Sequence, residues 1–380
     1  MDFLSDCWED ESSNKNVRLN QEGKKMLRNA LLTALLLVTL QTITPLAAET
    51  KLEGRVFGSW SLNMTEGADS YNKFGLDRSY ITAKSKISEY TSAVITFDLK
   101  EKNSDVDNGY YIILKYGYLD WQPEFASGYL NVILGLQSVK YIGFADNNIW
   151  KRRYIIRTVG DFNKFRSSAD LGATFNFKLG EKGKWGEAAL SVFNGASYSD
   201  VVEKNKQKDI NLFLALKPFT DDPEWGNSAL AGQFYSGTQN IAFGDSLEGE
   251  NYGRKIFSIA GSLANSDRFD LGVDLNWQTL GQGQGVADLS QFAHSFIASL
   301  HLRKFVGENS LLRTLNFFGR YDAFDYNTEI DDDGHSMYII GMECAPAKNI
   351  KASLNYRTID YQESGKKSDE FLSLNTDLKF

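Results

Sequence analysis

The sequence has 380 residues, of which 42% are hydrophobic and 13% aromatic, and its formal net charge is −8. This charge, together with the lack of a long basic block, disfavours nucleic-acid binding, and two cysteines provide neither a disulfide framework nor a cysteine metal site. A helical membrane protein needs apolar runs of about 20 residues, and only one stretch, close to the N-terminus, approaches that length.

The N-terminal part has the layout of a secretory signal peptide. Basic residues at 24–28 precede an apolar core, Ala30 to Leu40, and Pro45 and the small residues at 46–48 follow it. A charged region, a short apolar core and a small-residue cleavage site are the three parts of such a signal. We therefore predict that residues 1–48 are removed on export; a single N-terminal anchor is the alternative, which the short core disfavours.

Residues 1–25 fit this signal poorly, because they carry six acidic residues, the wrong charge for its first part. Translation that starts near Met26 explains the mismatch. Without residues 1–48 the chain keeps 36 Lys and Arg against 43 Asp and Glu, and so remains acidic. The remainder, 49–380, is expected to be one domain.

After Glu49 the sequence alternates between apolar and polar residues, as strands with two unlike faces do. Many of these runs reach ten or more residues, which is the length that a tilted strand needs to cross a bilayer. We count sixteen strands, an even number that allows an antiparallel barrel to close. Their expected ranges are 51–64, 74–87, 92–101, 109–121, 128–138, 168–179, 185–195, 207–218, 228–238, 255–264, 268–279, 290–303, 312–325, 335–345, 349–360 and 370–380.

The connections between these strands also alternate. Most turns after even-numbered strands are short, and connections after odd-numbered strands are often longer and more polar, which is typical of periplasmic turns and external loops. The four prolines after residue 48 are expected at the short-turn ends, because proline cannot donate to a strand ladder. They are Pro123, Pro218, Pro223 and Pro346.

The last expected strand ends on an aromatic residue. Leu372, Leu374, Leu378 and Phe380 lie on one largely apolar face, opposite a polar face. A terminus of this kind resembles the signal that the outer-membrane barrel assembly machinery reads. We therefore predict that Phe380 acts in assembly.

Three stretches resemble a known family of bacterial porins. They are FFGRYDAFD (317–325), YIIGMECAPAKNIKASLNYR (338–357) and LGLQSVKYIGFADNNIWKRRYI (134–155). These are similar to the phosphate-selective porin O and P type family. The resemblance implies a sixteen-stranded, homotrimeric channel for small hydrophilic solutes in the outer membrane of a Gram-negative bacterium, in contact with lipopolysaccharide and membrane lipid. It also implies that the third external loop folds into the channel.

The connection at 140–166 is that third loop, and it is strongly basic. It holds seven basic residues against Asp146 and Asp161, and rings of Arg or Lys favour anions in a pore. We predict that the loop forms an anion-attracting constriction; the alternative is that its basic side chains brace the loop against acidic wall residues. The seven are Lys140, Lys151, Arg152, Arg153, Arg157, Lys164 and Arg166.

Alternation also assigns charged strand residues to the inner wall, because charge is tolerated in a wet lumen and not against lipid. The basic residues that we expect to line the lumen are Arg78, Lys84, Lys115, Arg320 and Arg357.

Other functions are disfavoured but stay open. A barrel enzyme of the outer-membrane phospholipase type has a serine two positions after its histidine on the same face, and none of His294, His301 and His335 has this neighbour. A structural or adhesive barrel is the third class. We expect a passive channel with no catalytic residue, cofactor or metal, and with a modest preference for phosphate or other small anions.

Overall fold

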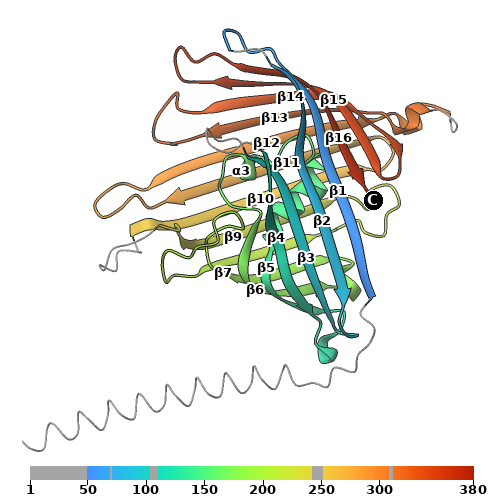
Figure 1. Cartoon of the computed structure of the whole chain (residues 1–380), viewed down its shortest axis with the longest axis vertical. Coiled ribbons are helices and arrows are strands. Elements are labelled where there is room, and N and C mark those ends of the chain that lie inside the picture. Colours follow the sequence, from blue (N-terminus) through green and yellow to red (C-terminus); the bar gives the residue numbers. More distant parts are fainter. Residues whose placement is uncertain (1–48, 69–70, 103–108, 242–250, 308–310) are drawn as a thin grey trace, which may run out of the picture. The chain divides into compact units, whose positions relative to one another are not determined.

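A computed structural model of the chain describes residues 49–68, 71–102, 109–241, 251–307 and 311–380. The predicted signal segment, 1–48, lies outside the described residues. Each strand pairs antiparallel with the next in sequence, and β1 pairs with β16, so the sheet closes into a sixteen-stranded barrel (Figure 1). The predicted antiparallel barrel is confirmed.

The strands have the following bounds. The first eight are β1 (Glu49–Asn63), β2 (Asn72–Lys86), β3 (Thr91–Lys102), β4 (Gly109–Trp121), β5 (Leu130–Ser138), β6 (Ala169–Leu179), β7 (Gly186–Phe193) and β8 (Asp209–Leu216). The others are β9 (Ala229–Thr238), β10 (Gly253–Asn265), β11 (Phe269–Leu280), β12 (Leu289–His301), β13 (Asn316–Asp325), β14 (His335–Ala347), β15 (Ile350–Tyr361) and β16 (Asp369–Lys379).

The helices are short. Three of them follow one another between β5 and β6, namely α2 (Lys140–Phe144), the π-helix η2 (Ala145–Trp150) and α3 (Val159–Phe162). Single 3-10 turns occur at η1 (Glu124–Ala126), η3 (Glu181–Gly183), η5 (Leu302–Lys304) and η6 (Leu311–Thr314). No helix in the described ranges has the length and apolar character needed to cross a membrane.

The observed strand bounds match the predicted ones to within two residues for fifteen of the strands. The exception is β13, which begins at Asn316 instead of 312, because the chain first makes the 3-10 turn η6. Pro346, expected at a strand end, lies in β14 where the pairing with β15 shifts between Cys344 and Ala347. An irregularity of this kind tolerates a residue that cannot donate to the ladder.

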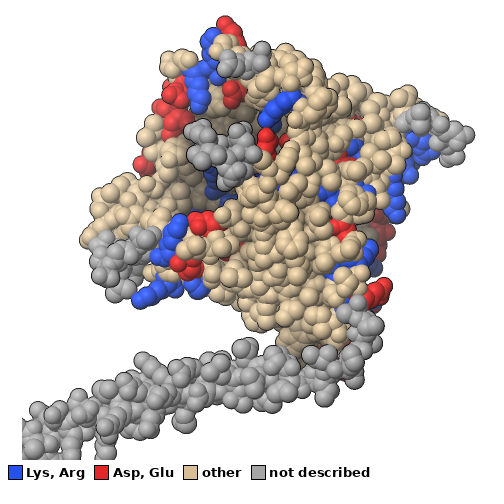
Figure 2. Space-filling model, in the orientation of Figure 1, with Lys and Arg blue, Asp and Glu red and all other residues tan. Residues whose placement is uncertain are grey.

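Alternation separates the two faces of the sheet as period two requires. On β8, Ile210, Leu212 and Leu214 are exposed, while Asn211 and Phe213 between them are buried. The outward residues are largely apolar, and Figure 2 shows a broad expanse of the surface without charged side chains, with Lys, Arg, Asp and Glu gathered along its edges. The inner face carries the buried polar and charged residues.

The seam between β1 and β16 includes the last residue. Phe380 donates its backbone N–H to Gly54 O (3.0 Å) and accepts the Gly54 N–H (2.7 Å). A Cβ at Gly54 would overlap the Phe380 ring, so the glycine provides the space in which the ring lies on the outer face. The ring itself is 74% exposed there.

Candidate functional site

The connection between β5 and β6, here called the inner segment (139–168), lies inside the ring of strands. Lys140 Nζ lies 3.3 Å from Glu187 Oε2 on β7, and the Tyr154 ring lies 6.4 Å from the ring of Phe57 on β1. Further polar contacts reach β11, β12 and β14. One segment touches strands on several sides of a closed barrel only from within it.

The inner segment packs its apolar side chains against one part of the wall. Trp150 is fully buried, its Nε1–H donates to Ile156 O (2.7 Å), and its ring packs edge-on against Phe318. The wall that receives this cluster runs from β7 to β15 and carries small or apolar inward residues where a water-filled lumen would favour polar ones. They include Ala189, Phe213, Ala215, Ala229, Ala231, Ala260, Ile297, Met337, Ile339 and Ile359.

The structure places six of the seven predicted basic residues of the inner segment in ion pairs. Four of the six pair with carboxylates of the strands, as in the bracing arrangement considered above, whereas Arg153 and Arg157 pair with Asp146 and Asp161 of the segment itself. The anion-attracting role of the predicted residues stays a prediction. Lys164 is exposed and forms no ion pair with a described carboxylate. The pairs are Lys140–Glu187 (3.3 Å), Lys151–Asp270 (3.0 Å), Arg152–Glu343 (3.5 Å), Arg153–Asp146, Arg153–Asp161 (3.0 Å), Arg157–Asp161 (3.8 Å) and Arg166–Asp170 (2.5 Å).

Arg153 is held within the segment by two carboxylates. Burial raises the pKa of the Asp146 carboxyl above its usual value, and the nearby Arg153 opposes this shift only in part. Although it is paired, Arg153 is also one of the residues that line two of the cavities described below.

Arg166 closes the other end of the inner segment in a buried charge cluster. Its guanidinium contacts Asp170 and lies 3.9 Å from Asp209, which also pairs with Arg254 (2.8 Å) and accepts the Tyr235 hydroxyl. The two arginines balance the two aspartates. Buried charges need such pairing, since an uncompensated one is strongly unfavourable.

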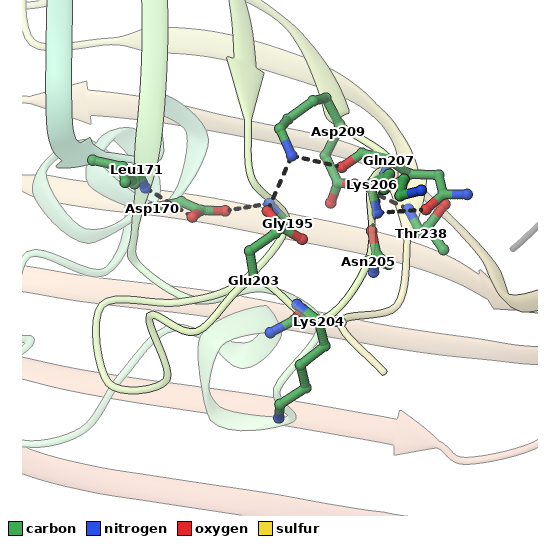
Figure 3. A network of polar contacts seen from close by, with 12 residues as sticks. Asp170, Leu171, Gly195, Glu203, Lys204, Asn205, Lys206, Gln207, Asp209 and Thr238 are labelled. Carbon is green, nitrogen blue, oxygen red and sulfur yellow. Dashed lines mark hydrogen bonds and ion pairs between the residues drawn. The ribbon is translucent and has the colours of Figure 1, made fainter. Parts of the chain in front are cut away.

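Backbone donors complete this cluster, as Figure 3 shows. Asp170 accepts the N–H groups of Leu171 (2.7 Å) and Gly195 (3.0 Å), and Asp209 accepts that of Thr238 (2.9 Å). The cluster therefore ties the end of the inner segment to β6, β8, β9 and β10.

Two wall residues predicted to line the lumen have no carboxylate partner among the described residues. Lys115 is 4% exposed, and its Nζ donates to the Tyr80 hydroxyl at 3.1 Å. Arg357 stacks on the Phe371 ring at 4.7 Å, and its Nε is buried without a hydrogen-bond acceptor. Their positive charges are therefore not cancelled by direct contact.

The other three predicted wall residues are paired. Arg78 donates to Asp98 (3.1 Å) and to the Tyr198 hydroxyl, and Lys84 donates to Glu53 (2.8 Å). Arg320 forms two hydrogen bonds with Asp322 (2.8 and 2.5 Å). Arg320 also donates to Arg157 O (2.9 Å), so it supports the inner segment directly.

Open space remains between the inner segment and the wall formed by β15, β16 and β1 to β4. Cavity A, of about 850 Å³, lies against this wall, and cavity B, of about 270 Å³, adjoins it at Arg153. Cavity C, of about 470 Å³, lies beside β4 to β8 and shares Ser138, Gly143 and Asn147 with cavity A.

Basic side chains outnumber acidic ones around each cavity. Cavity A is lined by Lys51, Arg55, Lys115, Lys151, Arg153, Lys351 and Lys379 against Glu53, Asp146 and Asp377. Cavity B is lined by Arg78, Arg153, Arg157 and Arg357 against Asp77. Cavity C is lined by Lys140, Lys178, Lys182 and Lys217 against Glu187.

Several of these lining residues were missed by sequence reasoning. Lys178 and Lys379 lie at the ends of β6 and β16, whereas Arg55 lies in the middle of β1. The signal was present for Lys379, which shares the period-two face of Asn375 and Asp377. Basic residues near strand ends are easily read as ordinary solvated turn residues, which is why the pattern did not single out Lys178 and Lys379.

The comparisons with known proteins show the fold. No family model matches the chain, and no curated relative does. Solved structures are similar to it. One is the outer membrane channel DcaP of Acinetobacter baumannii, with 13% identity over 88% of this chain and 97% of that chain and a TM-score of 0.60. Another is an anion-selective porin from Comamonas acidovorans, with 12% identity over 88% of this chain and 100% of that chain and a TM-score of 0.60. A trimer form of OmpT of Vibrio cholerae is similar as well (12%, 88% and 99%, 0.58). The chain thus shares its barrel fold with outer-membrane proteins, and its place in the phosphate-selective family stays a prediction.

Proposed function

We propose that this chain is an outer-membrane porin of a Gram-negative bacterium that passes small hydrophilic solutes and modestly prefers anions. The observation that carries the proposal is the excess of basic side chains around all three cavities inside the barrel. Basic rings favour anions in pores, and charges beyond the Debye length, about 10 Å at 0.1 M salt, are largely screened. The positive charge of the cavity lining should therefore affect ion selectivity more than the negative charge of the external loops does.

The fold supports the location. Its outward face is largely apolar, and fourteen of its sixteen strands have the nine or more residues that a tilted strand needs to cross a bilayer. Its structural neighbours are outer-membrane proteins, one of them described as anion-selective. We further propose a homotrimer in contact with lipopolysaccharide, in line with the trimer form of one neighbour.

The test is the reversal potential of the reconstituted protein across a salt gradient in a planar bilayer. The intact protein should conduct and prefer chloride over potassium. A variant that neutralises three lining cations, each of which forms no ion pair with a described carboxylate, is Lys115→Gln, Arg357→Gln and Lys379→Gln. It should shift the reversal potential toward cation preference, most clearly at low salt.

The matched control removes the same charge from connections that do not line the cavities, with Lys206→Gln, Lys304→Gln and Lys366→Gln. It should leave the reversal potential unchanged. An intact protein that does not conduct would contradict the porin proposal, and one that prefers potassium would contradict the anion preference.

A further inference from the structure

Cavity B combines arginines with uncharged hydrogen-bonding groups. On one side, β15, β16 and β1 present serine and asparagine side chains, and the inner segment lies opposite with Arg153 and Arg157. Arg78 and Arg357 complete the basic part of the lining. The uncharged groups are Ser59, Ser61, Asn355, Ser373 and Asn375.

Two arginines there, Arg157 and Arg357, are the candidates for holding an anion. The Arg357 Nε is buried without an acceptor, and the two acids that influence this residue, Asp369 and Asp77, lie beyond ion-pair contact. The Arg157 side chain is 38% exposed, and one of its terminal nitrogens donates to the Asp161 backbone O (3.3 Å) and lies 3.8 Å from the Asp161 carboxylate. Guanidinium groups bind carboxylate or phosphate oxygens through paired N–H donors.

The uncharged wall is ordered by its own hydrogen bonds. Ser61 and Ser373 share one at 3.0 Å, and the Asn355 amide donates to Asn375 at 2.8 Å. Hydroxyl and amide groups both donate and accept, so each keeps capacity for a further partner. Small anions such as chloride need none of these groups, whereas a solute with several hydroxyls matches them.

We propose that cavity B is a binding site for hydroxylated organic anions, with the anionic group on Arg157 and Arg357 and the hydroxyls on the Ser61–Ser373 and Asn355–Asn375 pairs. This inference deepens the proposed porin function and rests on it. The volume of about 270 Å³ lies near the lower end, roughly 300 Å³, of small-molecule sites. It therefore suits a solute the size of a single sugar acid.

The test uses block of the chloride current in planar bilayers at about 0.1 M salt, where screening is moderate. Three probes are compared. Gluconate carries a carboxylate and hydroxyls, hexanoate carries the carboxylate alone, and glucose carries hydroxyls alone. Gluconate should reach half-block at a concentration about tenfold below hexanoate, as one or two net hydrogen bonds provide. Glucose should block more weakly than gluconate.

Two variants assign the block to cavity B. The double variant Ser61→Ala with Ser373→Ala should raise the half-block concentration of gluconate to that of hexanoate and leave that of hexanoate unchanged. Arg357→Gln should weaken the block by both anions. Ser295→Ala, a buried inward serine of β12 that does not line cavity B, is the control and should alter neither.

Equal block by gluconate and hexanoate in a conducting, anion-preferring pore would overturn this inference and leave the porin function standing. Gluconate block that neither cavity B variant alters would overturn it too. A barrel without conductance would instead refute the proposed function.

Discussion

Replacing Arg166 by methionine is expected to loosen the inner segment without opening the barrel. The Arg166 side chain is 2% exposed and lies between Asp170 and Asp209, which are 1% and 0% exposed. Methionine keeps much of the aliphatic volume and removes the guanidinium. Asp209 then keeps its ion pair with Arg254, whereas Asp170 is left without an ion-pair partner among the described residues.

Removal of one partner from a buried ion pair costs about 3–5 kcal/mol. The lower end applies here, because Asp170 still accepts two backbone N–H groups, those of Leu171 and Gly195. About 3 kcal/mol corresponds to roughly a hundredfold rise in the population of locally open states. The sixteen-stranded ladder does not depend on Arg166, so the change should stay within the inner segment.

Hydrogen exchange measured by mass spectrometry on the folded protein in detergent tests this reasoning. Peptides from 139–168 should exchange about a hundredfold faster in Arg166→Met, and strand peptides should serve as an unchanged internal reference. Arg268→Met is the matched control, because Arg268 is exposed in the turn between β10 and β11. Adding Asp170→Asn to Arg166→Met should restore part of the protection by removing the uncompensated carboxylate. Unaltered exchange across 139–168 in Arg166→Met would refute the anchoring role.

Two further predictions concern the ends of the barrel. Deleting Phe380 removes two backbone hydrogen bonds to Gly54, and it should lower the yield of folded barrel on unheated gels while synthesis and export continue. Gly54→Ala should displace the Phe380 ring and lower the yield less. Gly232→Ala is the control and should leave the yield unchanged, because a Cβ there meets only ordinary contacts. A normal yield after the deletion would count against an assembly role. The mature chain is expected to begin near Glu49, and N-terminal sequencing of membrane-extracted protein that recovers residues 1–25 would disprove this.

The fold was readable from the sequence because a barrel strand has two unlike surroundings. Lipid on one side and a polar lumen on the other impose period two on every strand, as on β8, where Leu212 is exposed and Asn211 is buried. The four-residue error at β13 arose because the 3-10 turn η6 carries apolar residues that continue the strand pattern.

The site was readable only in part. Alternation assigns a side chain to a face, but it does not say which residue of another strand lies opposite an inner loop. Lys151 meets Asp270 of β11 and Arg152 meets Glu343 of β14, and these partners depend on how the inner segment folds across the lumen. The inward alanines of β8 to β10 were a usable signal, since small residues on a lumen wall leave room for something packed against it.

The pairing inside the barrel also explains how an acidic chain encloses cavities with a basic lining. Inward carboxylates such as Asp170, Asp209 and Glu343 lie close to Arg166 and Arg152 and so anchor the inner segment. They face the side of the lumen against which that segment packs. The wall beside the cavities keeps cations such as Lys115 and Arg357, which contact no carboxylate in the described part of the chain. In the proposed channel, a permeating ion would sense mainly the charges within about 10 Å that lack a direct partner. The net charge of the chain therefore sums the charges of the external loops and of the carboxylates that anchor the inner segment. The sign of the charge around the cavities depends instead on which carboxylates are already neutralised by ion pairs.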